Sequence, residues 1–146
     1  MTEWLARFRK NLHSAGDLWL LARLAGWLAI EPALIRLLPL PKLLAWHTPR
    51  RPAATNGRRE QIVLYTQFLL SDRLDAFERT CLKRSLVLYR FLQGGPAPVR
   101  FFLGVRSDQG RLRGHSWVTV AGQPLYPEEA KGYAVTFSYP PQEEAA

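Results

Sequence analysis

Residues 79–92 read RTCLKRSLVLYRFL and contain Cys81, the only cysteine of the chain. Apolar side chains recur through this stretch at three- and four-residue steps, which predicts a helix with one buried face. Gly94-Gly95-Pro96 then ends the helix, because glycine accepts a left-handed cap and proline cannot continue the hydrogen-bond ladder. We expect Cys81 near the first turn, where free N–H groups and the helix dipole favour a thiolate. An earlier start of the helix, through residues 76 and 77, is the alternative and weakens the dipole argument.

The periodicity of the chain changes after this helix. Residues 99–106 and 112–120 are rich in β-branched and aromatic side chains and flank a Ser-Asp-Gln-Gly turn at 107–110, which predicts two antiparallel strands. Residues 123–126 and 133–139 predict two more strands. Helices are expected earlier, over residues 15–30, from Pro32 to a stop at Pro39 and Pro41, and over 59–70. The predicted fold is therefore α+β, with the Cys81 helix packed on an antiparallel sheet of about four strands.

Residues 48–59 form the clearest linker, with two prolines, an Asn-Gly turn and no large apolar side chain. We therefore predict an N-terminal helical region over 1–57 and the main domain over 58–140. Residues 141–146 are expected to be a loose acidic tail.

The chain carries a net charge of +8 and is 47% hydrophobic, enough for a buried core. A single cysteine excludes an internal disulfide framework, so a cytoplasmic protein is expected. The three histidines, at positions 13, 47 and 115, are far apart and show no metal-ligand spacing, so neither a metal nor another cofactor is expected. A basic surface attracts acidic peptides, anionic lipid and nucleic acid alike. Because no nucleic-acid-binding motif accompanies the charge, no nucleic acid partner is expected.

Residues 18–46 are the most apolar part of the chain. Their longest run without a charge is Leu24 to Ile30, seven residues, against the roughly 20 that a membrane-spanning helix needs. The sequence therefore predicts helices that pack on the rest of the protein. Peripheral contact with a membrane is the alternative, since basic residues beside Trp and Leu suit a membrane interface.

Cys81 and His115 are the residues best suited to nucleophilic chemistry. Alternation along the strand puts His115 and Trp117 on one face and Ser116 and Val118 on the other. A paired imidazole turns a thiol into a thiolate, and a third group must hold the imidazole in orientation. Glu128 and Glu129 follow, in the order Cys, His, acid. A core cysteine, a structural histidine and a solvated pair of glutamates are the alternatives to this interpretation.

Three segments taken together resemble the lasso peptide leader peptidases. They are CLKRSLVLYRFL at 81–92, FLGVR at 102–106 and GHSWVTVAG at 114–122. The resemblance covers roughly residues 79–126, and the Leu- and Arg-rich segment at 18–44 resembles the N-terminal helices of that family more loosely. It implies a transglutaminase-like, papain-related cysteine protease fold.

The resemblance also implies a Cys-His-acid protease that removes the leader from a ribosomally made precursor peptide. Cys81 would be the nucleophile and His115 the general base, and the Cys81 backbone N–H would help to hold the oxyanion. The implied partners are the precursor leader, a small leader-recognition protein and the lasso cyclase. The family usually supplies an aspartate after the His strand, and no Asp follows His115, so we expect Glu128, with Glu129 as the alternative. A catalytically silent peptide-binding or scaffolding module is the alternative function.

Overall fold

The structure, a computed structural model, describes residues 2–10, 12, 14–49, 58–70, 81–95 and 97–140. Several predictions lie outside these ranges: most of the linker, any helical turn before Cys81, and the tail at 141–146. The helices are α1 (Thr2–Lys10), α2 (Ala15–Leu37), α3 (Leu40–Trp46), α4 (Arg59–Leu69), α5 (Cys81–Phe91), a 3₁₀ turn at Leu92–Gly94 and α6 (Pro127–Ala130). The strands are β1 (Val99–Asp108), β2 (Arg111–Val120), β3 (Gln123–Pro124) and β4 (Ala134–Tyr139).

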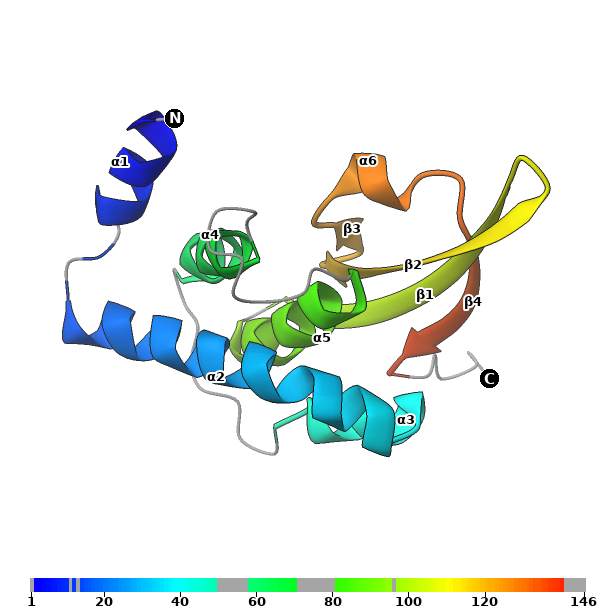
Figure 1. Ribbon diagram of the computed structural model, residues 1–146, viewed down its shortest axis with the longest axis horizontal. Coiled ribbons are helices and arrows are strands. Elements are labelled where there is room, and N and C mark those ends of the chain that lie inside the picture. Colours follow the sequence, from blue (N-terminus) through cyan, green and yellow to red (C-terminus); the bar gives the residue numbers. More distant parts are fainter. Residues whose placement is uncertain are drawn as a thin grey trace.

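The four strands form one antiparallel sheet in the order β3-β2-β1-β4, which confirms the predicted α+β class (Figure 1). Two-residue loops, Gln109-Gly110 and Ala121-Gly122, join β1 to β2 and β2 to β3. Both residues of each loop have a positive φ, the conformation that lets a two-residue loop follow the twist of a hairpin. Each loop has glycine at its second position, where this backbone carries no steric penalty.

Helix α5 lies between the sheet and α2, with α4 beside it, so it is covered on most sides (Figure 1). This explains why its residues 85–89 are all buried, although one of them is a serine. The hydrophobic core draws side chains from α2, α3, α4, α5 and the sheet, and its largest fully buried members are Leu24, Leu28, Leu43, Leu44, Ile62, Tyr65, Leu86, Leu88, Tyr89 and Phe101. The N-terminal helices therefore share one core with the rest of the described chain.

Helix α2 corrects the prediction of two helices separated at Pro32. Ser14 and Asp17 form a capping box at its start, and the helix then continues through Pro32 to Leu37. Proline removes one backbone hydrogen bond, but Leu28 and Glu31 on the inner face are fully buried and hold the helix on the core. Pro39 and Pro41 were predicted to end a helix. They also begin one, since Pro39 caps α3 and Pro41 lies in its first turn.

A buried contact between a histidine and a glutamate joins α2 to the end of α3. Glu31 and His47 are both fully buried, and a carboxylate oxygen of Glu31 contacts His47 Nε2. The Nδ1–H of His47 donates to the Leu43 carbonyl at 2.7 Å. Because buried polar groups are costly without a partner, this contact fixes α3 against α2.

Helix α2 is long and apolar enough to cross a membrane. The longest run without a charge, which is seven residues, did not indicate this. Only 22% of its most apolar window is buried inside the structure. The buried part includes Leu20, Leu24 and Leu28, which belong to the shared core.

Candidate functional site

The described part of helix α5 crosses the sheet from the outer edge of β2 toward β4. Ser116 Oγ donates to Ser85 Oγ at 3.2 Å, and one turn later the Tyr89 ring meets Tyr139 of β4 edge-on, with centroids 6.0 Å apart. Along the chain, α5 therefore runs from β2 toward β4. The helical turn before Ser85 lies at the outer edge of β2. Cys81 lies in that turn, four residues before Ser85 and thus on the same helix face. Its half-buried thiol makes no hydrogen bond to any described residue.

His115 stands on β2 where the strand has a neighbour on one side only. It pairs with Gly104 of β1, whereas β3 pairs with β2 only at Thr119 and Val120. Because Ser116 faces α5, His115 projects to the opposite face of the sheet, at this edge. The His115 side chain is 14% exposed, and its Nε2 is buried without a hydrogen-bond partner in the described part of the chain.

Aromatic rings fix the plane of the His115 imidazole. The imidazole lies nearly parallel to the Trp117 indole, with centroids 6.2 Å apart, and 5.1 Å from the Tyr133 ring. Gly104 makes this possible, because a Cβ there would lie 2.8 Å from Trp117 Cη2 and 2.9 Å from the Ala134 carbonyl oxygen. The glycine thus lets the indole lie against β1 beside the histidine.

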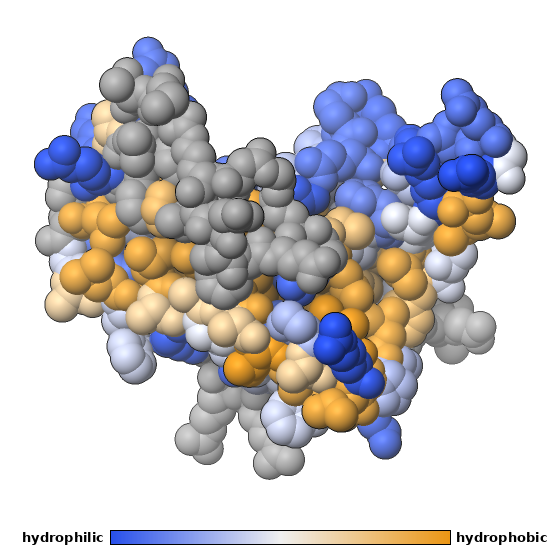
Figure 2. All heavy atoms as spheres, in the orientation of Figure 1, coloured by the Kyte–Doolittle hydropathy of each residue, from blue (hydrophilic) through white to orange (hydrophobic). Residues whose placement is uncertain are grey.

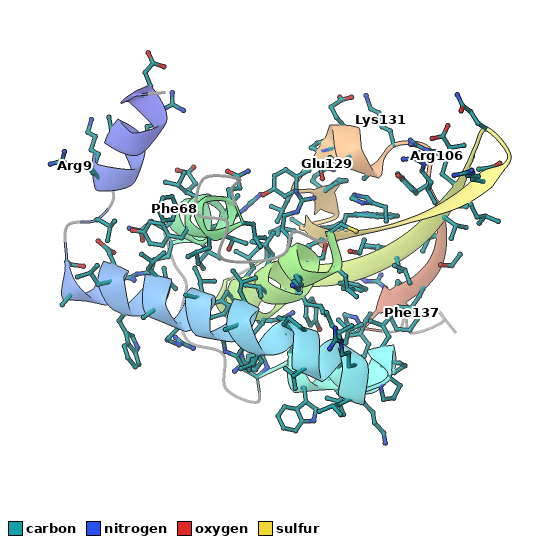
Figure 3. The ribbon with its side chains drawn as sticks, in the orientation of Figure 1. Arg9, Phe68, Arg106, Glu129, Lys131 and Phe137 are labelled. Atoms are coloured by element: carbon teal, nitrogen blue, oxygen red, sulfur yellow. The ribbon has the colours of Figure 1, made fainter. Side chains whose placement is uncertain are left out.

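The structure places Glu129, not Glu128, beside His115. A Glu129 carboxylate oxygen lies 3.8 Å from His115 Nε2, beyond hydrogen-bond range, whereas Glu128 is exposed and pairs with Lys131 at 2.9 Å (Figure 3). Both glutamates belong to α6, and successive residues on a helix point in different directions. The expectation that Glu128 lies next to the imidazole does not match this geometry, so we carry Glu129 forward in its place.

Arg84 connects α5 to this carboxylate. Its guanidinium pairs with both oxygens of Glu129 and lies over the Tyr126 ring, 4.4 Å from the centroid. Tyr126 in turn accepts a hydrogen bond from Gln67 of α4 at 3.1 Å. Since Arg84 is three residues after Cys81, the first turn of α5 reaches the same edge as His115 and Glu129.

Burial lowers the pKa of His115 below its usual value of 6.5. The Glu129 carboxylate acts in the opposite direction and raises the pKa, while Arg84 and Arg106 lower it further. The net direction favours a neutral imidazole, which can accept a proton, near neutral pH.

Backbone groups of β2 face outward at the same edge. In a two-residue hairpin, the two residues that flank the loop form a hydrogen-bonded pair, here Asp108 and Arg111. The backbone groups of the odd-numbered residues of β2 therefore bond to β1. Those of the even-numbered residues point away from β1. The Val118 carbonyl confirms this, because it accepts from the Leu125 N–H at 3.1 Å. Leu112 and Gly114, which are exposed, therefore present N–H and C=O groups on the side that no other described strand covers, whereas Ser116 is fully buried.

The sequence singled out Cys81 and His115, and the structure brings both elements to one edge without a hydrogen bond between thiol and imidazole. Sequence reasoning missed Arg84 and Tyr133. A signal existed for Arg84, since a cation on a largely buried helix needs a partner. Within the described ranges, no group of three or more His, Cys, Asp or Glu side chains could hold a metal ion.

Comparison with curated proteins and with solved structures finds no significant match. A family model does match, over residues 20–138, which run from within α2 to within β4 and contain both Cys81 and His115. The superfamily that it describes includes cysteine peptidases. On this match, the chain belongs to the transglutaminase-like superfamily.

Proposed function

We propose that this protein is a cysteine peptidase that removes the leader from a ribosomally made lasso precursor peptide, before a cyclase closes the ring. The superfamily is consistent with a cysteine peptidase. The observation that carries the proposal is the buried Nε2 of His115, which has no hydrogen-bond partner among the described residues. It lies beside a carboxylate at the sheet edge that the Cys81 turn of α5 approaches.

In this proposal Glu129 lies beside Nε2 of His115, so the other ring nitrogen, Nδ1, takes the proton of the Cys81 thiol, and the thiolate attacks the carbonyl carbon of the scissile peptide bond. The imidazolium then returns the proton to the leaving amine, and water hydrolyses the thioester. Glu129 holds the imidazole and stabilises its charged form, as the acid of a triad does. The thiol and imidazole must approach each other for this step, and catalytic hydrogen bonds often tighten only when substrate is bound.

The open edge of β2 would hold the peptide in an extended conformation. The outward N–H and C=O groups of Gly114, next to His115, can pair with a peptide as an added strand. Gly114 is exposed, and a Cβ built there would meet nothing nearer than the Gly104 carbonyl oxygen at 4.0 Å. A peptide paired with this edge of β2 would have one of its peptide bonds next to the His115 imidazole.

The test uses the protein with a lasso precursor peptide and its leader-recognition protein, and follows cleavage by mass spectrometry. We expect cleavage at one bond, and a loss of at least about 10³-fold in rate for Cys81→Ala and for His115→Ala. Lys131→Ala is the matched control, because this exposed side chain pairs with Glu128 and with no other described carboxylate.

A second readout needs no substrate. Iodoacetamide should alkylate Cys81 faster than a free model thiol, and His115→Ala should remove this advantage. Equal cleavage by the wild-type protein and both variants would refute the proposal. Tight leader binding without turnover, unchanged in Cys81→Ala, would instead identify a catalytically silent peptide-binding module.

A further inference from the structure

The outer surface of α2 and α3 is apolar and lies on the side of the molecule away from the sheet. We call it the α2–α3 face and define it by Leu18, Trp19, Ile30, Arg36, Leu37, Lys42 and Trp46, all of which are exposed. Figure 2 shows hydrophobic atoms along this lower side of the molecule. Trp19 is 67% exposed, Leu37 78% and Trp46 61%, values that are unusual for such large apolar side chains.

The exposed positions of α2 recur at three- and four-residue steps and so share one side of the helix. Apart from Ala15 and Gly16 at its start, these positions are Leu18, Trp19, Ala22, Gly26, Ala29, Ile30, Ala33, Arg36 and Leu37. Arg36 carries the only charge among them. The opposite side holds Leu20, Leu24 and Leu28, which pack into the core.

Both carboxylates of this region are buried, which leaves the surface with cations alone. Asp17 serves the capping box of α2 and accepts from Gln61 Nε2 at 3.1 Å, and Glu31 pairs with His47. The exposed charges of described residues 15–49 are those of Arg36 and Lys42. The sequence as a whole adds a net charge of +8.

We propose that the α2–α3 face binds the surface of a bilayer that contains anionic phospholipid. Tryptophan and leucine side chains would enter the interface, and Arg36 and Lys42 would meet lipid phosphates, which is the composition of helices that lie in the membrane plane. The net charge draws the protein toward such a surface. Helix α2 lies along the membrane and does not cross it, because its inner side remains in the protein core. This inference is independent of the proposed peptidase activity.

Sedimentation of the purified protein with vesicles tests the proposal. We expect binding to vesicles of phosphatidylcholine mixed with phosphatidylglycerol, and weaker binding to phosphatidylcholine alone or at high salt. The double variant Trp19→Ser/Leu37→Ser should weaken binding at least about tenfold, since two apolar side chains no longer enter the interface. Arg36→Gln/Lys42→Gln should remove the preference for phosphatidylglycerol.

Leu112→Ser is the matched control, because Leu112 is 76% exposed but lies on the β1–β2 hairpin. It should bind vesicles as the wild type does. Circular dichroism of each variant confirms that the exposed substitutions leave the fold intact. Equal sedimentation of the wild type and Trp19→Ser/Leu37→Ser, or no sedimentation with either vesicle, would overturn the proposal. A concentration-dependent dimer in analytical ultracentrifugation that this variant abolishes, without vesicle binding, would assign the face to a second copy and also overturn it.

Discussion

The His115 imidazole has two neighbouring groups of opposite charge that compete for its protonation. Glu129 raises the pKa of His115 and Arg84 lowers it, yet the two groups also bind each other. While Arg84 holds the carboxylate, Glu129 stays 3.8 Å from Nε2.

Replacing Glu129 should impair catalysis much more than replacing Glu128. Glu129→Gln removes the negative charge that stabilises the imidazolium, so we expect kcat/KM for precursor cleavage to fall by about 10²-fold or more. Glu128→Gln should stay within about twofold, because exposed ion pairs contribute little. Steady-state kinetics on the same precursor peptide measure both. A larger loss in Glu128→Gln than in Glu129→Gln would restore Glu128 as the acid.

Removing Arg84 should raise the pKa of His115. Arg84→Gln deletes a cation that lowers this pKa and frees the Glu129 carboxylate to move toward the imidazole. Titration of the His115 Cε1–H signal by NMR measures the change, and Arg113→Gln is the control, because Arg113 pairs with Asp108. A pKa that falls or stays constant in Arg84→Gln would contradict the arrangement.

The lowered pKa of His115 also predicts how the free energy of unfolding changes with pH. His115 binds a proton less readily in the folded than in the unfolded state, so its contribution to the free energy of unfolding is present above pH 6.5 and is lost as the pH falls through the folded pKa. Urea denaturation between neutral and mildly acidic pH should show a smaller loss in Arg84→Gln than in the wild type.

The residues of the candidate site were only partly predictable. Cys81 and His115 were candidates mainly through the family resemblance, because a lone thiol and a lone histidine are weak local signals. The acid was not predictable, since Glu128 and Glu129 are adjacent and their directions depend on how the four-residue helix α6 sits against β2. Arg84 gave only a weak signal, because its partner lies 45 residues away in the chain.

At the scale of elements, tertiary packing explains why α2 differs from the prediction made from its local sequence. Pro32 predicted a break because proline lacks the N–H that the helix interior needs. The buried residues on either side of it, Leu28 and Glu31 before it and the partly buried Leu34 after it, keep α2 continuous. The alternating strands were predictable because their periodicity is set by which face meets α5.

Gly104→Ala should destabilise the sheet, because the new methyl group would meet the Trp117 ring and the backbone of β4. We expect a loss of about 1–3 kcal/mol in the free energy of unfolding, the usual range for overpacking a core position. Gly26→Ala is the matched control, since nothing lies within 4 Å of a Cβ there. It should stabilise the exposed side of α2 by about 0.5–1 kcal/mol. Urea denaturation measures both, and equal effects would refute the role of the contact.

At the scale of the whole molecule, the candidate site and the α2–α3 face lie on different sides. In Figure 1, α6 and the β2 edge lie above α5, and α2 and α3 lie below it. A protein bound to a bilayer through α2 would therefore keep the β2 edge directed away from the lipid. A peptide substrate could then reach His115 from the aqueous side.

Residues 58–146 should not fold without the N-terminal helices. Removing residues 1–57 deletes five buried core leucines, Leu20, Leu24, Leu28, Leu43 and Leu44. At about 1.5–3 kcal/mol for each buried side chain, the loss is comparable to the 5–15 kcal/mol that stabilises a typical domain. It also exposes the side of α5 that packs on α2.

Urea denaturation followed by circular dichroism tests this prediction, and the fragment should show no cooperative transition. The control is removal of residues 1–13, which keeps the Ser14 cap of α2 and should leave a cooperative transition close to that of the full chain. Cooperative unfolding of the 58–146 fragment would show that the domain predicted over 58–140 is independent. In that case α2 and α3 would be an attachment to the catalytic fold, and their exposed face would be the main reason for their presence.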